Sequence, residues 1–196
     1  MPRPSLKQQR SREILEAFVT CVARYGLEGA TQDRIAEEAG VRRTLLRHYL
    51  GNRDDMVAAL GTHVVARFDQ LTDAFGEALH HSGTPSELID LLFDAGSATD
   101  PRLTLVFQAL TSAAQTNPQL RDPLRASIER FIALLSGHLR RVFAGQRKPA
   151  CDAVAHGLAA LFMTADSLSP LAPPPAWRTA QRRAAALLIA TLENPS

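Results

Sequence analysis

The segment from Thr31 to Met56 constrains the fold of this chain more than any other, because its sequence is typical of two short helices joined by a tight turn. Thr31 can cap the first helix, whose apolar residues recur at helical spacing. Gly40 can adopt the left-handed conformation that ends a helix, and Val41 fills the angle between the two helices. The segment therefore predicts a helix-turn-helix unit.

The second helix of this unit has one apolar and one polar face. Leu46 and Leu50 are four residues apart and are expected to point inward. The outward side chains are then those of Arg42, Arg43, Thr44, Leu45, Arg47, His48 and Tyr49. Such side chains offer donors to phosphates and to base edges in the major groove, which predicts duplex DNA as a partner. The alternative is a small helical hairpin with a solvated basic face.

Three patterns carry a wider resemblance. They are Ile14-Leu15 with Phe18 in a helix ending at Tyr25-Gly26, Thr31 with Ile35-Ala36 and Ala39-Gly40-Val41, and the stretch from Leu46 to Met56. Over Arg12 to Met56 the chain resembles the N-terminal domain of the TetR family of transcriptional regulators. The resemblance implies an all-α fold of about nine helices. It further implies a three-helix DNA-binding domain over 1–52 and a helical effector-binding and dimerisation domain over 53–196.

Several positions depart from the family pattern. Arg47 replaces a tyrosine that contacts phosphate, and Arg42 replaces a Ser or Thr. Leu45 stands where a base-contacting Thr or Ala is frequent; it either touches a thymine methyl or contacts nothing. Arg53 replaces the family's lysine at the start of the fourth helix, where a cation can hold a phosphate. With Thr31 and the outward residues above, Arg53 completes the predicted DNA-binding set.

The N-terminus is basic, although the net charge of the whole chain is only +2. Arg3, Lys7, Arg10 and Arg12 all precede Glu13, the first acidic residue. They form a basic arm that can contact phosphates or the minor groove beside the recognition helix. The alternative is a solvated tail.

Helical spacing continues beyond the helix-turn-helix unit. One long helix is expected from Arg53 to about His81, followed by further helices to the end of the chain. The last two, 149–168 and 176–192, are rich in small residues, which allow helices to approach closely. The resemblance implies a homodimer through these two helices, whereas they can also simply close the core of the monomer.

The resemblance further implies a binding pocket for an unknown small-molecule effector among the middle helices. Its candidate lining residues are Phe68, Leu71, Phe75, Phe107, Phe131, Leu135, His138, Phe162, Met163 and Asp166. This mixture suits an apolar or aromatic ligand with one or two polar groups. Most of these residues are more often part of an ordinary core, and His138, within an apolar stripe, is more often a satisfied buried histidine than a ligand contact or pH sensor.

The sequence contains no pattern that indicates catalysis. There is no nucleotide-binding glycine loop, zinc signature or nucleophile elbow, so we expect no enzyme activity, no cofactor and no metal. Cys21 and Cys151 are expected to be buried free thiols, with redox sensing as the alternative. The chain has no membrane span and no signal peptide, which predicts a cytoplasmic protein.

The sequence leaves three alternative functions open. The first is a ligand-responsive transcriptional regulator, a repressor that binds a palindromic operator as a homodimer and leaves it when the effector binds. The second is an architectural or division-linked DNA-binding protein without an effector. The third is a helical enzyme or carrier in which the motif is coincidental.

Overall fold

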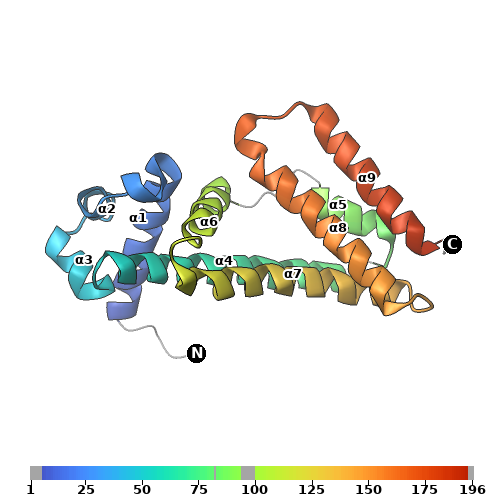
Figure 1. The fold of residues 1–196 in the computed structure, drawn as a ribbon, viewed down its shortest axis with the longest axis horizontal. Coiled ribbons are helices and arrows are strands. Elements are labelled where there is room, and N and C mark those ends of the chain that lie inside the picture. Colours follow the sequence, from blue (N-terminus) through green and yellow to red (C-terminus); the bar gives the residue numbers. More distant parts are fainter. Residues whose placement is uncertain (1–5, 82, 94–99, 194–196) are drawn as a thin grey trace. The chain divides into compact units, whose positions relative to one another are not determined.

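The computed structural model describes residues 6–81, 83–93 and 100–193, and these residues form helices and no strands (Figure 1). The α-helices are α1 (Leu6–Gly29), α2 (Gln32–Glu38), α3 (Arg43–Leu50), α4 (Arg53–His80), α5 (Pro85–Phe93), α6 (Pro101–Ala113), α7 (Arg121–Val142), α8 (Lys148–Ser167) and α9 (Pro175–Glu193). Two 3-10 turns, Pro118–Leu120 and Ser169–Leu171, precede α7 and α9. The predicted all-α fold is confirmed. None of the described helices is both long and apolar enough to cross a membrane.

The first helix is longer than the sequence predicts. It begins at Leu6, and its helical path is interrupted at Gly26, where φ is 71° and ψ is 171°. The predicted end at Tyr25-Gly26 therefore corresponds to this kink. Lys7, Arg10 and Arg12 lie on α1 itself, so the basic arm is helical from Leu6 onward. Arg3 lies outside the described residues.

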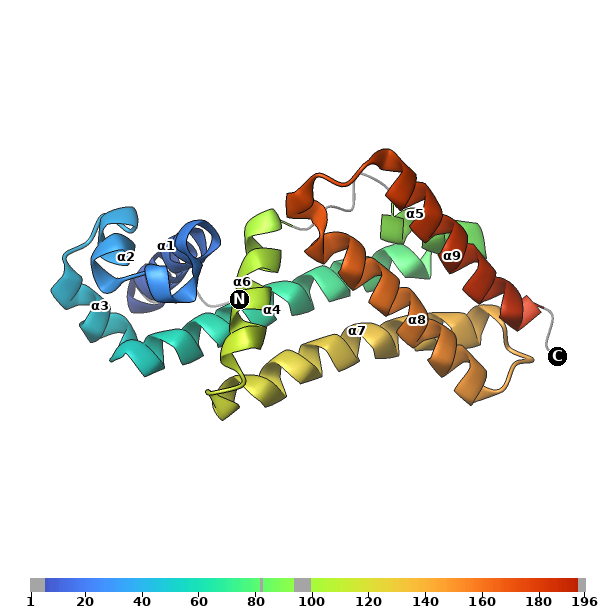
Figure 2. The same cartoon turned by 45° about the horizontal axis from the view of Figure 1, so that its top comes forward.

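The chain divides into two compact units, the first made of Met1–Arg67 and Arg102–Arg125 and the second of Phe68–Pro101 and Ala126–Ser196, so that α4 contributes to both. The predicted boundary after residue 52 remains a prediction. In the first unit, α1, α2 and α3 pack together with the first half of α4 (Figure 2). Helix α6 belongs to the same unit, and all five helices contribute fully buried side chains, among them Ile14, Phe18, Ile35, Leu46, Met56, Leu60 and Leu110.

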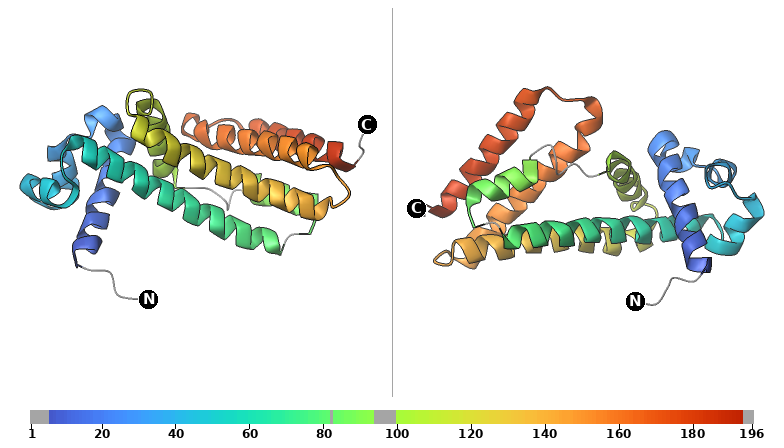
Figure 3. Two further views of the ribbon diagram at one scale, coloured as in Figure 1. Left: turned by 60° about the horizontal axis from the view of Figure 1, so that its bottom comes forward. Right: turned by 180° about the vertical axis from the view of Figure 1, so that it is seen from behind.

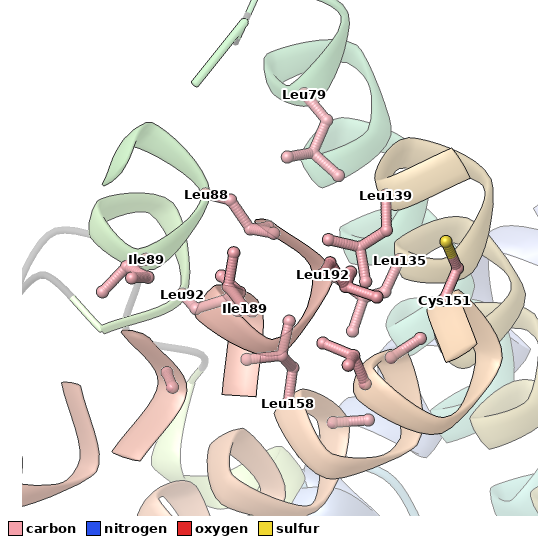
Figure 4. Close-up of a cluster of buried hydrophobic side chains, with 14 of the residues drawn as sticks. Leu79, Leu88, Ile89, Leu92, Leu135, Leu139, Cys151, Leu158, Ile189 and Leu192 are labelled. Atoms are coloured by element: carbon pink, nitrogen blue, oxygen red, sulfur yellow. The ribbon is translucent and has the colours of Figure 1, made fainter. Parts of the chain in front are cut away.

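The second unit is built from the second half of α4 and from α5, α7, α8 and α9. Its core contains Leu79, Leu88, Leu135, Leu158 and Ile189, one from each of these five helices (Figure 4).

Within this unit the second half of α4 runs alongside α7 (Figure 3). The Ser127 hydroxyl donates to Asp69 over 2.9 Å, and Arg130 pairs with Asp73. Because both residue numbers increase together, the two helices run in the same direction.

The last two helices of the unit form an antiparallel pair. The Gln146 side-chain amide donates to the Leu192 carbonyl over 2.7 Å near the open end of the pair. Further along, a Cβ atom at Gly157 would stand 2.9 Å from Leu188 Cδ1, so any larger residue there would require the Leu188 side chain to move.

Candidate DNA-binding surface

The start of α2 is held by a side-chain cap. Thr31 has extended backbone angles, and its hydroxyl accepts from the Arg34 N–H over 3.4 Å. Arg34 reaches back in turn, donating to the Gly29 carbonyl over 2.7 Å and lying 4.4 Å from the centroid of the Tyr25 ring. The cap predicted at Thr31 is confirmed, and this residue holds the entry to the helix-turn-helix unit.

The turn between α2 and α3 is closed by main-chain groups. Gly40 has φ 62°, in the left-handed region expected of it. The Val41 N–H donates to the Ala36 carbonyl over 2.9 Å, and the Gly40 N–H donates to the Glu37 carbonyl over 3.1 Å. These two bonds form a Schellman motif, so the sharp turn predicted from Gly40 is confirmed.

The recognition helix α3 presents the side chains that the sequence predicts. Leu46 is fully buried and Leu50 is half-buried. The exposed side chains are those of Arg42, Arg43, Thr44, Leu45, Arg47 and His48. Tyr49 is half-buried, and its ring meets that of His48 edge to face at 5.1 Å between centroids. The exposed side of α3 is therefore basic, and it includes one apolar side chain, Leu45, which is 39 % exposed.

The arginines of this surface differ in their contacts. Arg43 Nη1 lies 3.2 Å from Asp33 Oδ1, and its Nε donates to Gln32 over 3.3 Å. Both charged side chains are more than half exposed, so the pair adds little stability and Arg43 can exchange Asp33 for a phosphate. Among the described residues, the side chains of Arg42 and Arg47 have no hydrogen-bond or ion-pair partner. Sequence spacing did not reveal the Asp33 contact, because it joins two helices.

Arg53 contacts main-chain carbonyls within the first unit, a role that the sequence did not predict. Its guanidinium donates to the Ala30 carbonyl over 2.8 Å and also to the Leu27 carbonyl. Its Cζ lies 5.2 Å from the centroid of the buried Phe18 ring. The side chain thus ties the start of α4 to the turn between α1 and α2, and its predicted phosphate contact remains a prediction.

The start of α4 also carries a reciprocal cap. The Asn52 side chain accepts from the Asp55 N–H over 3.0 Å, and the Asp55 carboxylate accepts from the Asn52 N–H over 2.9 Å. Together with Arg53, this cap fixes the direction in which α4 leaves α3.

Three of the predicted effector-site residues form one aromatic cluster. The centroids of Phe75 and Phe131 are 5.8 Å apart, and those of Phe131 and Phe162 are 5.4 Å apart. Leu135 is fully buried in the adjacent core, whereas Leu71 is 42 % exposed. The remaining side chains are half-buried: Phe68, Met163 and Asp166 in the second unit, and Phe107 in the first.

His138 is buried, with only 3 % of its surface exposed. Arg141 Nη2 lies 3.0 Å from His138 Nδ1 and donates to the Leu79 carbonyl over 3.1 Å. Burial lowers the pKa of His138, and the charges of Arg141 and His80 lower it further. Because Arg141 can only donate, the hydrogen of the neutral ring is on Nε2. Nε2 has no partner among the described residues, unlike the satisfied histidine considered from the sequence.

Both cysteines are buried and free, as predicted. Burial raises the pKa of the Cys21 thiol, and the nearby Glu38 carboxylate raises it further. The reactive thiolate is therefore disfavoured at Cys21, which argues against the redox-sensing alternative there.

Sequence comparison finds relatives among helix-turn-helix transcriptional regulators. No family model matches the chain. The HTH-type transcriptional regulator BetI of Vibrio atlanticus is 23 % identical over 165 residues, covering 83 % of this chain and 80 % of that protein. BetI of Brucella anthropi is 32 % identical over 89 residues, covering 45 % of this chain and 44 % of the relative.

Solved structures share the fold. A transcriptional regulator from Pseudomonas aeruginosa PAO1 superposes with a TM-score of 0.77 at 24 % identity, covering 95 % of this chain and 91 % of that chain. A TetR-family regulator from Mesorhizobium loti gives a TM-score of 0.75 at 15 % identity, with 96 % and 97 % covered. FadR from Bacillus subtilis, in complex with stearoyl-CoA, gives a TM-score of 0.66 at 18 % identity, covering 91 % of this chain and 97 % of that chain. The chain is therefore similar in sequence to helix-turn-helix transcriptional regulators, and it shares its fold with regulators that include a TetR-family protein.

Proposed function

We propose that the protein is a transcriptional repressor that binds a palindromic operator as a homodimer and leaves it when a small apolar or aromatic effector binds. The observation that carries the proposal is the exposed basic face of α3, supported from behind by the buried Leu46. Two such faces in a dimer read both halves of a palindrome when they are about 34–36 Å apart. A regulator that sits on promoter DNA in this way blocks access to it.

The exposed side chains of α3 suit different kinds of contact with DNA. Arg42 and Arg47 carry charge that no described residue neutralises, and Arg43 has only an exposed partner, so all three suit phosphates or guanine edges. Leu45 lies among them and suits a thymine methyl. Thr44 and His48 add shorter donors on the same exposed helix. Thr31 and Tyr49 stand at the margin of this face.

We expect Arg47→Ala to weaken operator binding about 10- to 100-fold, because each head loses a charge-assisted contact of about 1 kcal/mol or more. If Arg47 holds a phosphate, the loss is uniform across DNA sequences, and the slope of log Kd against log salt falls by about 0.9 per head. Fluorescence anisotropy over a salt series measures both quantities.

The matched control is Arg125→Ala, which removes an equal charge from α7, where Arg125 pairs with Asp122 at 2.8 Å. It should leave the salt slope as in the wild type. A loss of discrimination between operators, with the slope unchanged, would instead assign Arg47 to a base.

The homodimer is proposed through α8 and α9, whose outer positions leave apolar and small side chains uncovered. Leu187 is 64 % exposed and Trp177 is 47 % exposed. Ala153, Ala160 and Ala180 are also exposed and leave room for a partner helix to approach. Two copies of such a helix pair form a four-helix bundle.

The effector is proposed to bind at the aromatic cluster of Phe75, Phe131 and Phe162, with His138 as a polar contact on α7. Phe131 and His138 are seven residues apart on one helix and therefore share a face. A buried Nε2–H without an acceptor is unfavourable, and a ligand oxygen would satisfy it. FadR from Bacillus subtilis, which has this fold, holds stearoyl-CoA, so the architecture accommodates an apolar ligand.

Replacing His138 by alanine should weaken the response to ligands that carry a hydrogen-bond acceptor by roughly tenfold or more, since the donor is lost. A suitable panel contains aromatic ketones, each beside the hydrocarbon of the same shape. Release of labelled operator is measured, relative to the operator affinity of each variant. If the ketones and hydrocarbons release both proteins equally well, His138 takes no part in effector binding.

The architectural DNA-binding role remains the second candidate because of one observation. Phe75, Phe131 and Phe162 pack on one another, so the protein's own side chains fill that part of the predicted pocket. A protein whose operator complex survives every compound of a broad effector screen would favour this role.

A further inference from the structure

One turn of α1 receives polar side chains from two other helices of the first unit. His63 Nε2 of α4 lies 2.9 Å from Glu16 Oε1, and Arg67 Nη1 lies 3.7 Å from the same oxygen. One turn further along, Arg102 at the start of α6 donates to the Thr20 hydroxyl over 3.1 Å. We call these five residues the α1 junction.

The junction differs from the exposed ion pairs elsewhere on α1. His63 is only 12 % exposed and Glu16 is 37 % exposed, so their contact is partly shielded from water. By contrast, the Arg10–Glu13 pair lies within α1 at a spacing of three residues and is largely exposed. The junction joins α1 to α4 and α6 through side chains, whereas the Arg10–Glu13 pair does not leave α1.

The polar contacts of the α1 junction are directional, which apolar packing alone is not. The apolar side chains of α1, such as Phe18 and Val22, hold the helix against its neighbours through burial, which has little directional preference. A hydrogen bond between a carboxylate and an imidazole is short and directional. The Glu16–His63 contact therefore restricts rotation of α1, and of the helices packed on it, relative to α4.

We infer that Glu16 is a positioning residue that sets the half-site spacing read by the dimer. The inference rests on the proposed function, since it requires two heads on one palindromic operator. Glu16 would act through His63 and Arg67 by fixing the orientation of α1, α2 and α3 on α4. A head without this contact would sample a wider range of orientations and tolerate a wider range of operator spacings.

The test compares Glu16→Ala with Glu13→Ala, a matched variant that removes the same charge from an exposed pair within α1. Two DNA duplexes are used: the operator selected from a random pool, and the same half-sites separated by one additional base pair. The spacing penalty is the ratio of the two Kd values by fluorescence anisotropy. We expect Glu13→Ala to keep the wild-type penalty and Glu16→Ala to reduce it at least fivefold. Glu16→Gln, which retains an acceptor for His63, should lie between them.

A second variant guards against simple unfolding. His63→Gln breaks the same contact from α4, and combining it with Glu16→Ala should reduce the penalty no further than either change alone. Circular dichroism of each variant confirms that it is folded. Equal penalties for Glu16→Ala and Glu13→Ala would overturn the inference while the proposed function stands. A wild-type protein that is indifferent to spacing would overturn the proposed two-headed binding and the inference together.

Discussion

Leu187→Glu is expected to convert the proposed dimer into a monomer and to abolish the specific operator binding proposed for it. Leu187 lies on α9 and is 64 % exposed, so the substitution disturbs no core of the monomer. In a two-fold interface each substitution occurs twice, which places two carboxylates in an apolar contact. An uncompensated buried charge costs roughly 4 kcal/mol, which weakens dimerisation about a thousandfold.

Analytical ultracentrifugation at micromolar concentration measures the association, and anisotropy measures operator binding. Leu6→Glu is the matched control, because Leu6 is an exposed leucine on α1, in the other unit. This variant should remain a dimer. A Leu187→Glu protein that associates as the wild type does would place the interface elsewhere.

Arg53→Ala is expected to cause the largest loss of stability among substitutions of the arginines on the helix-turn-helix unit. The change removes charged donors to the Leu27 and Ala30 carbonyls and the contact with the Phe18 ring. Hydrogen bonds to charged groups contribute about 1.5–3 kcal/mol each, so we expect a loss of ~2–4 kcal/mol in the free energy of unfolding. For a chain of this length the melting temperature falls by roughly 5–15 °C.

Circular dichroism melting checks this expectation, and Arg53→Lys separates charge from geometry. A lysine has the charge but lacks the planar fork that reaches two carbonyls, so it should recover only part of the loss. Arg42→Ala, which removes a cation without a described partner, should melt as the wild type does. If Arg53→Ala also melts as the wild type does but binds DNA weakly, the phosphate role predicted from the sequence would be correct after all.

The helix-turn-helix unit could be predicted in detail because its determinants are local. The Thr31 cap, the left-handed Gly40 and the inward Leu46 each depend on residues within one or two helical turns. The long fourth helix was likewise predicted from Arg53 to within one residue of its observed end, since regular apolar spacing marks a helix throughout.

Partners between helices could not be predicted in the same way. Sequence periodicity tells which face of a helix is buried, but it does not tell which residue of another helix will meet that face. Arg53 was assigned to phosphate for this reason, whereas its donors contact carbonyls 23 and 26 residues earlier in the chain. The Glu16–His63 contact spans 47 residues and had no sequence signal.

The candidate effector site shows the same limit. The aromatic residues on α4, α7 and α8 do meet, because each lies on the apolar face of its helix. The tautomer of His138 depends instead on Arg141, one turn along the same helix, together with the Leu79 carbonyl of α4. Composition predicts an apolar, partly aromatic pocket, whereas the unsatisfied Nε2 of His138 becomes apparent only from the way the described helices pack.

The main-chain closure of the turn at Gly40 bears on how this protein can evolve. Neither hydrogen bond of that turn uses a side chain of α3. Mutations on the outer face of α3 can therefore accumulate without loosening the hairpin, and each new set of side chains is presented in the same geometry. The exposed side chains of α3 and the stability of the turn can therefore change independently of each other. Arg42, Leu45 and Arg47, which differ from the pattern that the sequence resembles, can therefore be replaced while the scaffold beneath them stays intact.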